Sequence, residues 1–82
     1  MKVDREAISE KVLASVATVA GADPGDLRPE TELVNDLNLD SLAMFELVIE
    51  LEESYDLRIS DEDIDRIRTI EDIIDYIVRQ AG

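Results

Sequence analysis

Apolar residues recur at helical spacing along this 82-residue chain, and no segment shows the apolar–polar alternation of a strand. From Asp4 to Ala20 they fall at positions 8, 12, 16 and 19, and Gly21 is typical of a helix end. A second helix is predicted from Ser41 to about Tyr55. A chain patterned in this way buries one face of each helix against the others, so the predicted fold class is all-α.

Two further helix starts carry the S/T-x-x-D form of a capping box, Ser60 with Asp63 and Thr69 with Asp72. The first opens a short helix that carries Ile64 and Ile67. The second opens a last helix with an inward stripe of isoleucines at positions 70, 73, 74 and 77. We therefore expect a single domain over residues 1–82, a four-helix bundle of three main helices plus one short helix.

The first two helices are joined by a long connection, from Gly21 to Asp40. It opens with the turn-forming stretch "GADPGDLRPE" and has no strong periodicity. Because a connection of this length is unusual in a compact domain, we expect apolar side chains to anchor it: Leu27, Leu33, Val34 and Leu37.

The formal net charge is −13, and the acids are concentrated in the middle of the chain. Between positions 30 and 65 there are thirteen acidic residues and one basic residue, Arg58. The charge argues against binding to nucleic acid or to an anionic membrane through such a surface, and a basic protein or a cation is the natural partner. The chain has no cysteine, which excludes disulfides and fits a reducing, cytoplasmic setting, and no apolar run approaches membrane-spanning length.

The second helix has two contrasting sides. Its core arc consists of Met44, Leu47, Val48, Leu51 and Tyr55, with Phe45 at the edge. The opposite side carries Glu46, Glu50 and Glu53, with Leu42 and Ile49 at the margin. This stripe is either a solvated surface or a docking face. Glu46 and Glu50 repel each other by about 0.2–0.5 kcal/mol, an arrangement that an electrostatic recognition surface would accept.

Ser41 lies in the first turn of that helix, with Asp40 as the expected N-cap. It is either a simple helix-start residue or a site that another enzyme modifies. A serine nucleophile needs a base, the chain has no histidine, and neither Lys2 nor Lys11 lies in a catalytic motif, so we expect no enzymatic activity. A phosphodiester at Ser41 would lie beside the free N–H groups of the helix start.

Two groups of acidic residues have a spacing that partly matches calcium-binding loops. Asp36, Asn38 and Asp40 match the first ligand positions of an EF-hand loop, but Ser41 and Leu47 stand where Gly and Glu are required. The Asp61-x-Asp63-x-Asp65 spacing fails at Arg66. We expect no dedicated metal site, although crowded carboxylates leave weak divalent binding open.

The stretch "DLNLDSLAMFELVIELEESYDLRISDEDIDRIRTIEDIIDYI", Asp36 to Ile77, resembles acyl carrier proteins of the free-standing bacterial type. The resemblance implies that Ser41 carries 4'-phosphopantetheine, transferred from coenzyme A by a separate magnesium-dependent phosphopantetheinyl transferase. The thiol of that arm would hold acyl groups as thioesters, which supplies the sulfur that this cysteine-free chain lacks.

The resemblance also assigns two sets of residues. Those that would dock on basic patches of synthase enzymes are Asp40, Leu42, Glu46, Ile49, Glu52 and Glu53. Those that would surround a sequestered acyl chain are Phe45, Val48, Leu51, Ile59, Ile64, Ile67 and Ile74.

Three positions depart from the usual pattern of the family: Asn38 replaces the common Gly, Ala43 replaces an acid, and Arg58 lies in a commonly acidic stretch. The implied function is that of a monomeric carrier in fatty acid biosynthesis. A carrier for a polyketide or specialised lipid pathway is the alternative. An acidic helical cation-binding or interaction module, such as a nucleic-acid mimic, is a more distant one.

Overall fold

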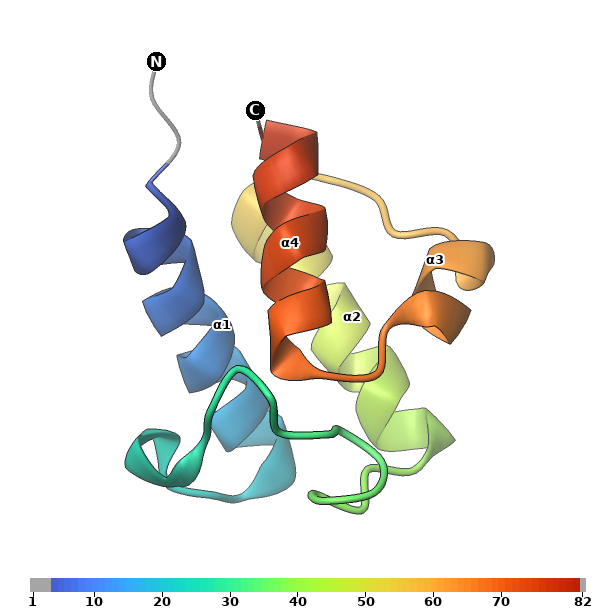
Figure 1. Cartoon of the computed structure of the whole chain (residues 1–82). Coiled ribbons are helices and arrows are strands. Elements are labelled where there is room, and N and C mark those ends of the chain that lie inside the picture. Colours follow the sequence, from blue (N-terminus) through green and yellow to red (C-terminus); the bar gives the residue numbers. More distant parts are fainter. Residues whose placement is uncertain (1–3, 82) are drawn as a thin grey trace.

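The computed structural model describes residues 4–81, which form four α-helices and one short 3-10 turn (Figure 1). The elements are α1 (Arg5–Ala20), η1 (Pro24–Asp26), α2 (Ser41–Tyr55), α3 (Asp61–Arg66) and α4 (Ile70–Ala81). The prediction of an all-α fold with three main helices, one short helix and a long first connection is confirmed. Over the described residues, no helix has the length and apolar character needed to cross a bilayer.

The ends of α1 follow from its sequence. Asp4 is the N-cap, and its carboxylate accepts hydrogen bonds from the backbone N–H groups of Glu6 and Ala7, so the helix begins one residue later than predicted. Gly21 ends the helix in the left-handed conformation, with φ 68°, as expected for a glycine at this position.

Both predicted cap hydroxyls bond to the first turn of their helices, and the second capping box is complete. The Ser60 hydroxyl accepts from the backbone N–H of Asp63 at 3.2 Å, and the Thr69 hydroxyl accepts from that of Asp72 at 3.1 Å. In the second box, the Asp72 carboxylate also accepts from the backbone N–H of Thr69. The predicted extent of the short helix is corrected by one residue, because Ile67 has extended backbone and lies just past the end of α3.

Helices α1, α2 and α4 enclose the core. The predicted apolar faces meet there: Val12 and Val16 from α1, Leu47 and Leu51 from α2, and Ile70, Ile73 and Ile77 from α4 are buried. Each of these side chains contributes on the order of 1.5–3 kcal/mol when fully buried, so the core rests on the three long helices.

The long connection is anchored at three buried leucines. Leu27 and Leu33 are buried and Leu37 is partly buried, as predicted. The prediction for Val34 is wrong: its side chain is 56% exposed, and Leu39 is buried instead. Residues 33–37 form a turn, so the apolar side chains do not share one face as they would in a regular element.

The same connection is bonded to the start of α4. Backbone N–H groups of Ile70 and Glu71 donate to the carbonyl oxygens of Thr31 and Pro29, at 3.1 and 2.8 Å. These bonds place the connection beside the α3–α4 linker, at the end of the molecule where α2 begins (Figure 1).

Candidate functional site

Ser41 is the first residue of α2, and it is exposed. Asp40 is the N-cap as predicted, and its Oδ1 accepts from the backbone N–H of Ala43 at 2.8 Å. Because the Asp40 carboxylate is the cap, the Ser41 hydroxyl is not required for capping. The serine therefore presents its oxygen to solvent from a rigid helix terminus.

The residues before Ser41 hold that terminus in place. Asn38 has a φ of 56°, a left-handed backbone that the common Gly of the family adopts without strain and that Asn tolerates better than most other residues. Its N–H donates to the carbonyl of Val34 at 2.9 Å, and that of Leu39 donates to the carbonyl of Leu33 at 3.1 Å. The side chains of Leu33 and Leu39 are both buried, so the segment that leads to Ser41 is anchored in the core.

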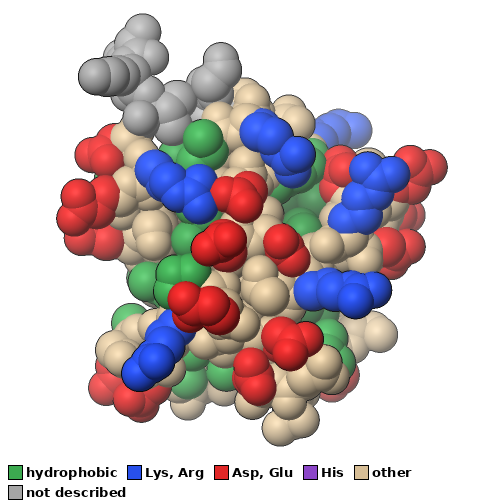
Figure 2. All heavy atoms as spheres, in the orientation of Figure 1, with side chains coloured by type: hydrophobic (Ala, Val, Ile, Leu, Met, Phe, Trp, Pro, Cys, Tyr) green, Lys and Arg blue, Asp and Glu red, His purple; other side chains and the backbone are tan. Residues whose placement is uncertain are grey.

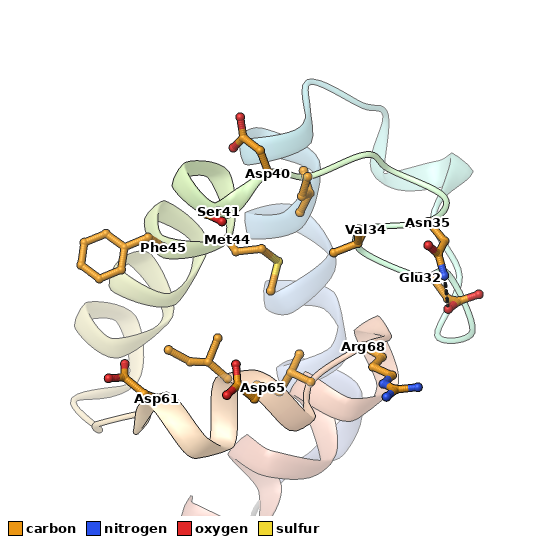
Figure 3. Close-up of a pocket in the computed structure, with 13 residues that line it drawn as sticks. Glu32, Val34, Asn35, Asp40, Ser41, Met44, Phe45, Asp61, Asp65 and Arg68 are labelled. Atoms are coloured by element: carbon orange, nitrogen blue, oxygen red, sulfur yellow. Dashed lines mark hydrogen bonds between the residues drawn. The ribbon is translucent and has the colours of Figure 1, made fainter.

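A groove of about 770 Å³ lies beside Ser41, between α2 and α3 (Figure 3). Its apolar lining consists of Val34, Leu39, Met44, Phe45, Ile64 and Ile67. Figure 3 shows the Met44 side chain directed into the space between the two helices, whereas the Phe45 ring points outward. A volume of this size is in the range of small-molecule sites.

The residues assigned to the acyl pocket fall into two groups. Phe45, Ile64 and Ile67 line the groove, together with Val34, Leu39 and Met44, which that assignment did not include. Val48, Leu51, Ile59 and Ile74 are buried in the core instead, each less than 8% exposed. Sequence periodicity separates buried from exposed faces but does not distinguish core packing from groove lining, which explains the difference.

The outer surface of α2 combines acids with exposed apolar side chains. Leu42, Phe45 and Ile49 are 66%, 59% and 38% exposed, and Glu46 and Glu53 are exposed beside them. The helix contains no Lys or Arg. By contrast, side chains of both signs are interspersed over the face formed by α1 and α4 (Figure 2). Among the four α-helices of the described residues, α2 alone carries acids without a Lys or Arg.

Glu52 differs from the other acids assigned to docking. It is partly buried, and its Oε2 accepts a 2.8 Å hydrogen bond from the backbone N–H of Ile59. The carboxylate thus already has a partner within the chain, on the segment that joins α2 to α3.

Tyr76 lies close to the same segment. Its hydroxyl is 3.0 Å from the carbonyl oxygen of Arg58 and 3.0 Å from Oδ2 of Asp63. Burial, and then the neighbouring Asp63 carboxylate, raises the pKa of Tyr76 above its usual value, so the hydroxyl remains a hydrogen-bond donor at neutral pH. Among the described residues, no group of three or more carboxylates converges as metal ligands would.

Comparison with known proteins decides the family. The family pattern described as "Phosphopantetheine attachment site" matches residues 10–77. The acyl carrier protein of Syntrophobacter fumaroxidans is 42% identical over 98% of this chain and 99% of its own length.

The chain belongs to the acyl carrier protein family. The meromycolate extension acyl carrier protein of Mycobacterium leprae is 36% identical over 94% of this chain and 67% of its own length. A solved structure of the acyl carrier protein from Enterococcus faecalis superposes with a TM-score of 0.79 at 32% identity, covering 94% of this chain and 98% of that one.

Members of this family are carriers and not enzymes, and they bear covalently attached 4'-phosphopantetheine. The residues present fit that group: an exposed hydroxyl at a helix start, with an apolar groove beside it. Acyl carrier proteins interact transiently with synthase enzymes and with acyl chains, and the acidic surface of α2 has the charge that basic enzyme surfaces would attract.

Proposed function

We propose that this carrier holds growing acyl chains as thioesters on 4'-phosphopantetheine attached to Ser41, in cytoplasmic fatty acid biosynthesis. The main support is the exposed Ser41 hydroxyl beside the groove between α2 and α3. A helix start, an exposed hydroxyl and an apolar groove meet at this point of the described structure, as attachment of the arm at Ser41 requires.

In the loading step, the Ser41 oxygen attacks the pantetheine-side phosphorus of coenzyme A. A new phosphodiester bond forms, and the adenine nucleotide half leaves with the bond electrons. The chain has no histidine or cysteine, so the phosphopantetheinyl transferase must supply the base that takes the serine proton, together with its magnesium ion. The N–H groups at the start of α2 favour the product anion by about 0.3–1 kcal/mol.

The docking surface in this proposal is formed by side chains that are exposed or partly exposed on α2 and at its cap: Asp40, Leu42, Glu46, Ile49 and Glu53. Acids orient the carrier on a basic enzyme surface, and the apolar side chains are buried on contact. We expect the interaction to be transient, because each ion pair between exposed side chains contributes little.

The groove shelters the chain between visits to enzymes. Each methylene that enters an apolar environment gains up to about 0.8 kcal/mol. The carboxylates of Asp61 and Asp65 and the cation of Arg68 also border the groove, so its apolar part is limited and long chains would have to displace core side chains.

The decisive experiment is incubation of the purified chain with coenzyme A, magnesium and a promiscuous phosphopantetheinyl transferase, followed by intact mass. We expect the gain of one phosphopantetheine unit in the wild type and none in Ser41→Ala. No gain in the wild type, or an equal gain in the variant, would refute attachment at Ser41.

The pathway is tested with elongation enzymes. Asn38-Leu39 argues against peptidyl and aryl carriers, which usually have a Gly-Gly pair in this region, and this supports the fatty acid assignment. We expect the loaded carrier to be malonylated and elongated by the transacylase and ketosynthase of a fatty acid system. Elongation only by enzymes of a polyketide or specialised lipid pathway would favour that alternative. A monomeric mass in light scattering is expected throughout.

A further inference from the structure

Helix α3 is held only weakly by its own packing. All six of its residues keep part of their surface exposed, and only Ile64 packs against the core. Yet Asp61, Ile64 and Asp65 line the groove beside Ser41, so α3 forms one wall of it. A short helix with so little buried surface needs other interactions to stay in place.

The first such interaction comes from α2. Glu52 Oε2 accepts the hydrogen bond from the Ile59 N–H at 2.8 Å, and the Ile59 side chain is buried. This bond fixes the segment 57–60, which leads directly into α3. A charged acceptor makes it stronger than a typical neutral hydrogen bond.

The second comes from α4. The Tyr76 side chain is buried. Its hydroxyl lies within hydrogen-bond distance of two acceptors, the Arg58 carbonyl oxygen on the segment before α3 and the Asp63 carboxylate on α3 itself. The same Asp63 oxygen also accepts from the Ser60 hydroxyl at 2.9 Å. One buried side chain of α4 thus contacts both the entry to α3 and its first turn.

We propose that Glu52 and Tyr76 are positioning residues that hold α3 as the wall of the acyl groove, and that Glu52 acts within the carrier more than at the docking surface. The inference rests on the proposed function, because it takes the groove as the shelter of the acyl chain. In this proposal Glu52 contributes mainly to protection of the acyl chain and less to recognition of partner enzymes.

Hydrogen exchange of the unmodified chain tests the positioning itself. In Tyr76→Phe and Glu52→Ala, amides of residues 61–67 should exchange about three- to tenfold faster, the factor that corresponds to one lost hydrogen bond. Amides in the middle of α1 should be unaffected. Glu52→Gln retains an acceptor for the Ile59 N–H and should exchange more slowly than Glu52→Ala. Unchanged exchange at 61–67, or uniform acceleration in all helices, would overturn the proposal.

Thioester protection tests the consequence. Each variant is loaded from octanoyl-coenzyme A by the transferase, and the thioester is cleaved with neutral hydroxylamine and followed by intact mass. We expect cleavage about three- to tenfold faster in Tyr76→Phe and Glu52→Ala than in wild type, since a loosened wall exposes the chain more often. Wild-type cleavage rates in both variants would refute the assignment.

Two matched controls accompany these variants. Tyr55→Phe removes a tyrosine hydroxyl that has no hydrogen-bond partner among the described residues, and Glu10→Ala removes an exposed glutamate of α1. Both should be cleaved at the wild-type rate, and acceleration equal to that of Tyr76→Phe would show a nonspecific effect and overturn the proposal.

The role of Glu52 in docking is tested by charge removal alone. Glu52→Gln should slow enzyme-catalysed acyl transfer at low salt less than Glu53→Gln does, because the Glu53 carboxylate is exposed. Equal or greater slowing by Glu52→Gln would place Glu52 in the docking surface. If Ser41 is not loaded at all, the proposed function fails, whereas the exchange experiment on the unmodified chain still decides whether Glu52 and Tyr76 hold α3.

Discussion

The backbone N–H of Leu33 donates a 2.9 Å hydrogen bond to the carbonyl oxygen of Arg68, which joins the long first connection to the α3–α4 linker. Leu33 is fully buried, and the linker follows the helix that walls the groove. The two irregular segments of the chain therefore support each other. Through Leu39, which bonds to Leu33, this junction also supports the start of α2 and Ser41.

The left-handed backbone at Asn38 predicts how that position responds to substitution. A β-branched residue is strained at a φ of 56°, so Asn38→Val should lower the free energy of unfolding by about 1–2 kcal/mol. Asn38→Gly should be neutral or slightly stabilising. Urea denaturation monitored by circular dichroism measures both, and Asn35→Val on the same connection is the control. Equal losses at positions 35 and 38 would contradict the prediction.

Asp72 predicts a stability loss at acid pH. Burial alone would raise its pKa, but the N–H groups of Arg68 and Thr69 donate to its carboxylate, and its net pKa lies below the usual value. A lowered pKa in the folded state contributes stability above the ordinary value near 3.8, and this is lost as the pH falls through the folded-state pKa.

Removing that carboxylate tests the contribution. Asp72→Ala should lower the free energy of unfolding at neutral pH by about 1–2 kcal/mol. The difference from wild type should shrink below about pH 4. Urea titrations over this range measure it, and a difference that stays constant with pH would contradict the assignment.

Tyr55 and Tyr76 should lower the stability of the fold at alkaline pH. Burial raises the pKa of Tyr55, and burial together with Asp63 raises the pKa of Tyr76, both above the ordinary tyrosine value of 10.0. The unfolded chain therefore loses these protons first, and stability should fall as the pH rises above about 10. Tyr55→Phe and Tyr76→Phe should each reduce this alkaline loss when unfolding is measured from about pH 8 to pH 11.

At neutral pH, Tyr55→Phe and Tyr76→Phe should change the free energy of unfolding in different ways. The Tyr55 hydroxyl is buried without a hydrogen-bond partner in the described structure, so Tyr55→Phe should be neutral or should stabilise by up to about 1 kcal/mol. Tyr76→Phe should destabilise by about 1–2 kcal/mol, because its hydroxyl bonds to the Arg58 carbonyl and to Asp63. Equal effects would mean that the hydroxyl contacts do not matter.

Charge reversal at Glu46 should affect partners and leave the fold intact. Glu46→Lys removes the repulsion with Glu50 and should keep or slightly raise the melting temperature. Phosphopantetheine transfer at low salt should slow by about three- to tenfold. Glu10→Lys makes the same charge change on α1, away from the docking surface, and is the control. Equal slowing in the two variants would assign the effect to net charge.

Screening of the acidic surface should raise stability. Added sodium chloride, from about 0.05 to 0.5 M, shortens the range of repulsion among the acids between positions 30 and 65. We expect the melting temperature to rise in thermal unfolding, and to rise further with magnesium. A flat response would show that self-repulsion is not a significant destabilising term.

Much of this structure follows from local rules. The helices and the caps at Asp40, Ser60 and Thr69 could be predicted, because each depends on residues within a few positions. The exposure of Val34 and the burial of Leu39 could not, because they depend on a turn bonded to a distant linker. For the same reason, the bonds of Glu52 and Tyr76 to the segment before α3 leave no trace in helical periodicity.

The uneven distribution of charge has one further consequence. With acids alone on α2 and both signs on the face of α1 and α4, the negative charge is centred away from the middle of the molecule. A positively charged enzyme surface would therefore exert a torque on the carrier before contact and turn the α2 side, which begins at Ser41, toward it. Rotation precedes collision, so a larger share of encounters begins with the arm facing the active site, and this advantage disappears as salt shortens the range of the field.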